Sequence, residues 1–124
     1  MKKLIALSLI ALSLTTTSCV SEDWDPMKLS KKEFVFPAEG GTDSIKVKNY
    51  SSWWIEHAFV DKNYYCDDFR STKADWMEVV VPDDKRNWVF VTVSENTTDS
   101  IRKAYLEMTA GDIFKSIPIT QNSK

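Results

Sequence analysis

The sequence predicts an all-β fold, specifically an immunoglobulin-like antiparallel β-sandwich of about seven strands, and three observations lead to this prediction. From about Leu29 onward, apolar and polar residues alternate with a period of two, which is the pattern of half-buried strands. Turn-forming residues interrupt the alternation roughly every eight to twelve positions, as in short strands that fold into two packed sheets. Beyond Leu29, no stretch has the apolar spacing of a helix.

The turn residues divide the chain into successive strands. Phe34 and Phe36 share one face of the first strand, which stops at Pro37. Gly40 and Gly41 then supply a tight turn that needs positive φ. The same alternation predicts the remaining strands over residues 45–48, 53–60, 76–81, 88–93, 104–108 and 113–119.

The strand 53–60 begins with two adjacent tryptophans, which cannot both face the core. An uninterrupted alternation places four side chains on one face, namely Trp53, Ile55, His57 and Phe59. Trp54, Glu56, Ala58 and Val60 then face the other way. We assign Trp53 and Trp76 to the core, and we expect His57 to pack in or beside it rather than to act as a general base.

Residues 61–75 mix aromatic and charged side chains with no clear period, so they are predicted to form the longest loop. Cys66 lies in this loop. Its sulfur is expected either to remain a free thiol or to be buried as a small hydrophobic group.

The first eighteen residues are organised as a secretory signal. Lys2 and Lys3 precede an apolar run from Leu4 to Leu14, and small polar residues lead up to Cys19. At about 1.5 Å per helical residue, this run covers roughly half of a ~30 Å hydrocarbon core, so we expect cleavage rather than a membrane span. The arrangement resembles a bacterial lipoprotein signal. It predicts a signal peptide over residues 1–18, lipidation of Cys19 and a tether over residues 19–28.

Two features around Cys19 have alternative interpretations. In ordinary secretion its thiol would be free or would pair with Cys66, the only other cysteine, whereas acyl chains on Cys19 would hold the protein at a membrane. Ser21, Glu22 and Asp23 resemble the surface-export signal of Bacteroidetes lipoproteins, which implies an outer-membrane protein that faces the cell exterior. Alternatively, these residues form only a solvated tether.

The charge balance argues against nucleic acid as a partner. Without residues 1–18, which contain Lys2 and Lys3, the net charge is −4, and the basic residues are scattered among acidic ones. A polyanion-binding protein needs clustered Lys and Arg. The length fits a single domain over residues 29–124, with no second apolar segment long enough to cross a membrane.

In their order and spacing, the elements over residues 29–122 resemble a BACON domain, a Bacteroidetes-associated sandwich linked to carbohydrate binding. The residues that carry the resemblance are Gly40 and Gly41, Asn49, Asp75 with Trp76, Asn96, Arg102, and Ile117, Pro118, Ile119, Thr120 and Gln121. The resemblance implies an immunoglobulin-like fold and a role in handling polysaccharide or mucin. It brings no binding residues to carry over. Residues 61–75 and 81–88 depart from the family's usual connections.

No set of residues in the sequence indicates catalysis, so we predict a protein that is not an enzyme and has no cofactor or metal. One histidine and one thiol after Cys19 cannot form a usual zinc site, and no loop has a calcium-binding pattern. Asp67 with Asp68 and Asp83 with Asp84 could in principle bind calcium or act as glycosidase carboxylates. Adjacent acidic residues usually point apart and mark solvated turns.

Glycan binding requires only exposed flat rings beside polar groups, and the chain contains five Trp and four Tyr. The candidate glycan-binding residues are Trp54, Tyr64, Tyr65, Phe69 and Trp88. For each of them the alternative is packing in the core or anchoring of a loop.

The tripeptide Asp-Ser-Ile occurs at residues 43–45 and 99–101 and resembles the short O-glycosylation motif of Bacteroidetes secreted proteins. Ser44 and Ser100 would be the acceptors. The simpler interpretation is that Asp and Ser end a turn just before a strand.

Two hypotheses follow from the sequence. The first is a non-catalytic cell-surface lipoprotein that binds a glycan through aromatic residues of segment 61–75 and the neighbouring strand. The second is a structural or protein-interaction module that packs against another outer-membrane component through the same residues.

Overall fold

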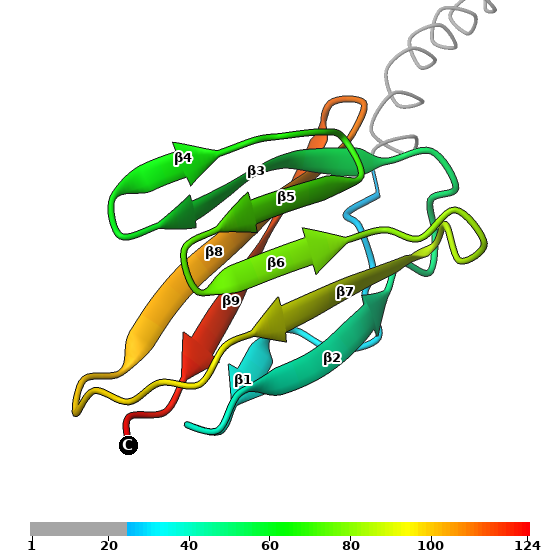
Figure 1. The fold of residues 1–124 in the computed structure, drawn as a ribbon. Helices are drawn as coiled ribbons and strands as arrows, with labels where there is room; N and C mark the ends of the chain where they lie inside the picture. The colour runs from blue at the N-terminus through cyan, green and yellow to red at the C-terminus, as the bar shows by residue number, and fades with distance from the viewer. Residues whose placement is uncertain (1–24) are drawn as a thin grey trace, which may run out of the picture.

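The computed structural model describes residues 25–124 and confirms the all-β sandwich (Figure 1). One sheet has five strands in the order β1-β9-β8-β3-β4, and the other has four in the order β2-β7-β6-β5. Every pairing is antiparallel except that of β1 with β9. The strands are β1 (Phe34–Phe36), β2 (Gly41–Lys46), β3 (Trp54–Val60), β4 (Asn63–Tyr65), β5 (Ser71–Ala74), β6 (Met77–Val80), β7 (Trp88–Val93), β8 (Arg102–Ala110) and β9 (Ile113–Gln121).

All seven predicted strands are present, but the prediction of one long loop over residues 61–75 is wrong. This segment forms two further strands, β4 and β5, at the edges of the two sheets. Asp61 and Lys62 both have positive φ, 50° and 70°, so they form a two-residue hairpin turn that pairs Val60 with Asn63. Asp75, with φ of 40°, begins the two-residue turn between β5 and β6, in which Trp76 does not have positive φ.

A β-bulge in β3 corrects the predicted faces of this strand. Ile55 pairs with Met108 and His57 with Glu107, so Glu56 is an extra residue in β3. The extra residue reverses the alternation, because successive side chains point to opposite sides of a strand. Ala58 and Val60 therefore join Ile55 in the core, whereas His57 and Phe59 lie half-buried on the opposite, outer side.

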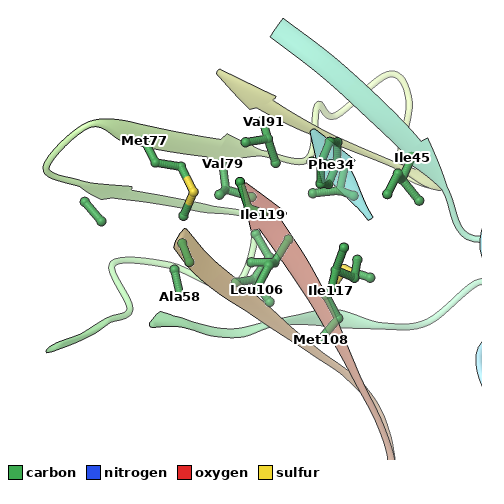
Figure 2. Close-up of a cluster of buried hydrophobic side chains, with 14 of the residues drawn as sticks. Phe34, Ile45, Ala58, Met77, Val79, Val91, Leu106, Met108, Ile117 and Ile119 are labelled. Carbon is green, nitrogen blue, oxygen red and sulfur yellow. The ribbon is translucent and has the colours of Figure 1, made fainter. Parts of the chain in front are cut away.

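The core lies between the inner faces of the two sheets. Figure 2 shows Leu106, Ile117 and Ile119 of the five-stranded sheet facing Val79 and Val91 of the four-stranded sheet, and all five are essentially inaccessible to solvent.

Both tryptophans that we assigned to the core contact it. Trp76 is buried beneath the Arg102 guanidinium, which lies 5.3 Å from the centre of the indole ring. Trp53 is only partly buried at the edge of the core. Its Nε1 is shielded from solvent and has no hydrogen-bond partner among residues 25–124.

Residues 25–28, expected to belong to the tether, are packed against the sandwich. Met27 is buried in the core, and the Asn49 side chain accepts a hydrogen bond from the Lys28 amide (2.8 Å) and donates one to the Pro26 carbonyl (2.9 Å). The Tyr50 hydroxyl donates to the Asp25 carbonyl. Cys19 and the predicted signal peptide lie outside the described residues, within which no helix is long and apolar enough to cross a membrane.

A buried polar cluster closes the opposite end of the sandwich, where β9 ends. The Gln121 side chain is fully buried, and its amide nitrogen donates to the carbonyl oxygens of Ser94 (2.8 Å), Pro37 (3.2 Å) and Ala38 (3.2 Å). Its amide oxygen accepts a hydrogen bond from Arg102 (3.1 Å). The cluster joins the β1–β2 turn to the segment that follows β7.

Candidate aromatic binding face

The outer side of the five-stranded sheet is rich in aromatic residues. We call this surface the aromatic face. It comprises Trp54, His57, Phe59, Tyr64, Phe69, Tyr105 and Phe114. Except for Phe69, which follows β4, these residues alternate along their strands with residues that fill the core.

Strand register lines up the central rings of this face. Phe59 lies between Tyr64 on β4 and Tyr105 on β8, and Tyr105 is in turn opposite Pro118 on β9. The Tyr64 ring is 4.9 Å from the Phe59 ring and meets the His57 ring edge-on at 4.8 Å. The outer rings remain accessible, because Tyr64 is 70% exposed and Tyr105 is 48% exposed. The ring side chains of Tyr64, Phe59, Tyr105 and Pro118 therefore form a row across the strands β4, β3, β8 and β9.

The start of β3 contributes a second group of rings. The Trp54 and Phe69 rings are 6.3 Å apart, and they line a hollow of about 480 Å³ together with Ser52, Trp53 and Arg70. Arg70 also forms an ion pair with Asp83 at 3.2 Å. The hollow thus combines apolar rings with a guanidinium group at its edge.

The bulge residue Glu56 places a carboxylate beside this hollow. Glu56 Oε1 accepts a hydrogen bond from the Trp54 indole nitrogen at 3.3 Å and one from the Thr109 hydroxyl at 3.4 Å. Thr109 is paired with Phe114, which is 61% exposed, so the aromatic face continues onto β9. Such an arrangement can stack against the apolar face of a ring and hydrogen-bond its hydroxyl groups.

The structure brings together three of the five predicted glycan-binding residues. Trp54, Tyr64 and Phe69 lie on the aromatic face. Tyr65 is paired with Ala58 and packs, partly buried, against the core. Trp88 lies on the outer side of the four-stranded sheet beside Phe90, with ring centres 6.5 Å apart.

Sequence reasoning missed Tyr105 and Phe114 as members of this face. The signal that could have found Tyr105 was present, because Tyr105 alternates with the apolar residues Ala104 and Leu106 in the predicted strand 104–108. Phe59 was missed for a different reason, since the bulge at Glu56 cannot be read from the alternation.

The acidic pairs serve as turn and surface residues. Asp67 accepts a hydrogen bond from the Lys73 amide (2.8 Å), and Asp68 accepts one from the Arg70 amide (3.3 Å). Among residues 25–124, no group of three or more His, Cys, Asp or Glu side chains is placed to hold a metal ion. Cys66 is exposed and forms no disulfide with any described residue, so the structure does not support burial of its sulfur.

The two Asp-Ser-Ile sites differ in structure. Ser44 lies half-buried within β2 rather than in a turn, and its amide donates to Asp43. Partial burial favours the neutral form of Asp43, but hydrogen bonds from Lys31 and the Ser44 amide, with the Lys31 charge, hold its pKa below the ordinary value. Ser100 is exposed in the turn before β8, as the sequence predicts.

The chain is an all-β sandwich domain, and two solved structures are similar to it in fold. A solution structure of a protein from Bacteroides thetaiotaomicron matches with a TM-score of 0.68 and 27% identity, over 81% of this chain and 89% of that one. A Bacteroides ovatus GH5 xyloglucanase, in complex with a XXXG heptasaccharide, matches with a TM-score of 0.55 and 17% identity. This second match covers 79% of the present chain but only 19% of the xyloglucanase, and it shows the fold alone. No family model and no curated protein matches the sequence.

Proposed function

We propose that this protein is a non-catalytic outer-membrane lipoprotein, anchored through Cys19, that binds a polysaccharide or mucin glycan through the aromatic face. The observation that carries the proposal is the pair of rings beside the start of β3, where half-buried Trp54 and exposed Phe69 line a hollow beside Arg70. Aromatic rings that remain in water cost free energy unless a ligand covers them.

The chemistry of the hollow fits a sugar. The flat Trp54 and Phe69 rings offer apolar surface to the C–H groups of a pyranose, while Arg70 and Glu56 can donate to and accept from its hydroxyl groups. Tyr64 and Tyr105 extend the face and add phenolic hydroxyls, so several successive sugar units could lie across the sheet.

Two resemblances support this proposal. The sequence resembles a BACON domain, which implies polysaccharide or mucin handling. The xyloglucanase, one part of which shares the sandwich fold, was solved with a heptasaccharide.

The sequence around Cys19 supports the lipid anchor, because a basic start and an apolar run precede this cysteine.

A second candidate function, an interaction module for an outer-membrane protein, is favoured by the width of the exposed apolar surface. Val35 on β1 is 56% exposed, and its register with Thr120 places it on the same side of the sheet as Phe114. Neither side chain offers a hydrogen bond to a sugar. Exposed apolar side chains spread over this side of the sheet also fit a protein interface.

Affinity electrophoresis of residues 25–124 through gels containing mucin or plant polysaccharides tests the first function. We expect retardation by at least one polymer, and about a tenfold weaker interaction in Trp54→Ala and in Tyr64→Ala, equivalent to ~1.4 kcal/mol for each lost ring. Trp88→Ala is the matched control, because it removes a ring from the opposite sheet. Circular dichroism verifies that each variant is folded.

The outcomes separate the two functions. Retardation that survives Trp54→Ala and Tyr64→Ala but is lost in Trp88→Ala would place the sugar on the other sheet and refute the proposed site. An absence of retardation on every polymer would favour the interaction module. Incorporation of labelled palmitate into the full chain, abolished by Cys19→Ala, tests the lipid anchor separately.

A further inference from the structure

Five cationic side chains that are scattered in the sequence lie at one corner of the four-stranded sheet. We call them the basic corner, and they are Lys28, Lys46, Lys48, Lys85 and Arg86. Backbone hydrogen bonds bring their segments together, since the Lys48 amide donates to the Lys28 carbonyl (2.8 Å) and the Val47 amide donates to the Asn87 carbonyl (2.8 Å). Figure 1 shows the corresponding segments at the same end of the sandwich.

These cations are available to a partner. All five side chains are exposed, and none forms an ion pair within residues 25–124. Asp83, in the same loop as Lys85, is occupied by Arg70 at 3.2 Å. Asp25 and Asp84 are exposed at this end and reduce its positive charge without cancelling it.

Half-buried aromatic rings lie beside the cations. Lys46 pairs with Trp88 across β2 and β7, and Lys85 Nζ lies 5.8 Å from the centre of the Phe90 ring. Trp88 and Phe90 are both partly exposed on the outer side of this sheet. Lysine next to partly exposed tryptophan is a combination suited to a membrane interface, where the ring lies at headgroup depth and the ammonium group meets phosphate.

The first described residues, from Asp25 onward, lie at this same end. Asp25 and Pro26 are held there by Tyr50 and Asn49, and Met27 is buried. At about 3.3–3.6 Å per residue, the segment between Cys19 and Asp25 can span at most roughly 20 Å. A lipid on Cys19 would therefore keep the basic corner close to the bilayer surface.

We propose that the basic corner rests on anionic lipid headgroups and fixes the orientation of the domain on the membrane. This inference uses the lipid anchor of the proposed function to place the corner next to the bilayer. Trp88 would lie at the headgroup level, with Lys48 and Lys85 against phosphates. The aromatic face is on the other sheet, so headgroups and a ligand would contact opposite sides of the sandwich. The Trp54–Phe69 hollow would lie at the end nearer the membrane, because its Arg70 pairs with Asp83 of the same loop as Lys85.

Vesicle binding of the unacylated mature chain, residues 19–124, tests the proposal without relying on the anchor. We expect co-sedimentation with phosphatidylcholine vesicles that contain phosphatidylglycerol, loss of binding at high salt, and no binding to phosphatidylcholine alone. Each charge removed from the corner should weaken binding about fivefold, so Lys48→Gln with Lys85→Gln should weaken it roughly 25-fold. Lys62→Gln with Lys103→Gln is the matched control, because it removes the same charge from the five-stranded sheet.

Two results would overturn the proposal. An equal loss in both double variants would show attraction through net charge alone and overturn the basic corner. Failure to bind anionic vesicles would overturn it as well, and retention on an acidic polysaccharide in that case would assign the cations to a different ligand. Because the assay uses no acyl chain, these failures are distinguishable from a failure of Cys19 to incorporate palmitate.

Discussion

Replacing Gln121 with leucine is expected to lower the free energy of unfolding by about 3 kcal/mol. The change preserves the approximate size of a fully buried side chain but removes its amide. The carbonyl oxygens of Ser94 and Pro37 then lose their contacts with the amide nitrogen, and Arg102 loses the amide oxygen. Each hydrogen bond lost in this way is worth about 0.5–1.5 kcal/mol.

The loss is smaller than the sum of these contributions because some groups keep other partners. The Ala38 carbonyl still accepts a hydrogen bond from the backbone N–H of Asn96 at 2.7 Å. Arg102 still reaches the carbonyl oxygens of Ser94 and Glu95, at 3.4 Å each. The Pro37 carbonyl likewise still accepts a hydrogen bond from the Gly40 backbone amide at 3.1 Å. The expected change therefore comes from the loss of the hydrogen bonds that the Gln121 amide makes, and not from carbonyl oxygens left without any partner.

Urea denaturation followed by tryptophan fluorescence measures this loss in the free energy of unfolding. In thermal unfolding, the melting temperature should fall by roughly 15 °C for a domain of this size. Thr120→Val is the matched control, because Thr120 precedes Gln121 on β9 but points to the outer side of the sheet. It should change the stability by no more than about 0.5 kcal/mol. A loss below about 1 kcal/mol in Gln121→Leu would show that water replaces the amide.

The alternation of apolar residues was sufficient to predict seven strands and the sandwich, because each of these strands has a side that fills the core. It could not predict β4. Asn63 and Tyr64 are exposed, and the turn before them is formed by Asp61 and Lys62 rather than by glycine. Edge strands with little burial leave a weak periodic signal, and register is then set by the turn.

The candidate site was only partly predictable for a related reason. The richness in aromatic residues showed that exposed rings were to be expected, and two of the candidates, Tyr64 and Phe69, are exposed, whereas Trp54 is half-buried on the same face. Which sheet carries each ring depends on strand order, so Trp88 could not be separated from the others in advance. A single extra residue at Glu56 moved Phe59 to the outer side, and nothing in the local sequence marks that bulge.

Gly40→Ala is expected to destabilise the domain by about 3–4 kcal/mol, through two independent costs. Gly40 has φ of +87°, a conformation that side chains with a Cβ rarely adopt. An added Cβ would also lie 2.6 Å from the Val93 carbonyl oxygen and 3.0 Å from the Ser94 carbonyl carbon. These are backbone atoms, so the methyl group can be accommodated only by moving the β1–β2 turn away from the end of β7.

Gly111→Ala separates the two costs. Gly111 also has positive φ, +64°, but an added Cβ there meets no atom within 4 Å. This control should lose only the conformational contribution, about 1–2 kcal/mol. If both variants lose the same stability, close packing at Gly40 contributes nothing. A larger loss in Gly40→Ala would show that glycine is required there by the close approach of the end of β7 as well as by the turn that leads into β2.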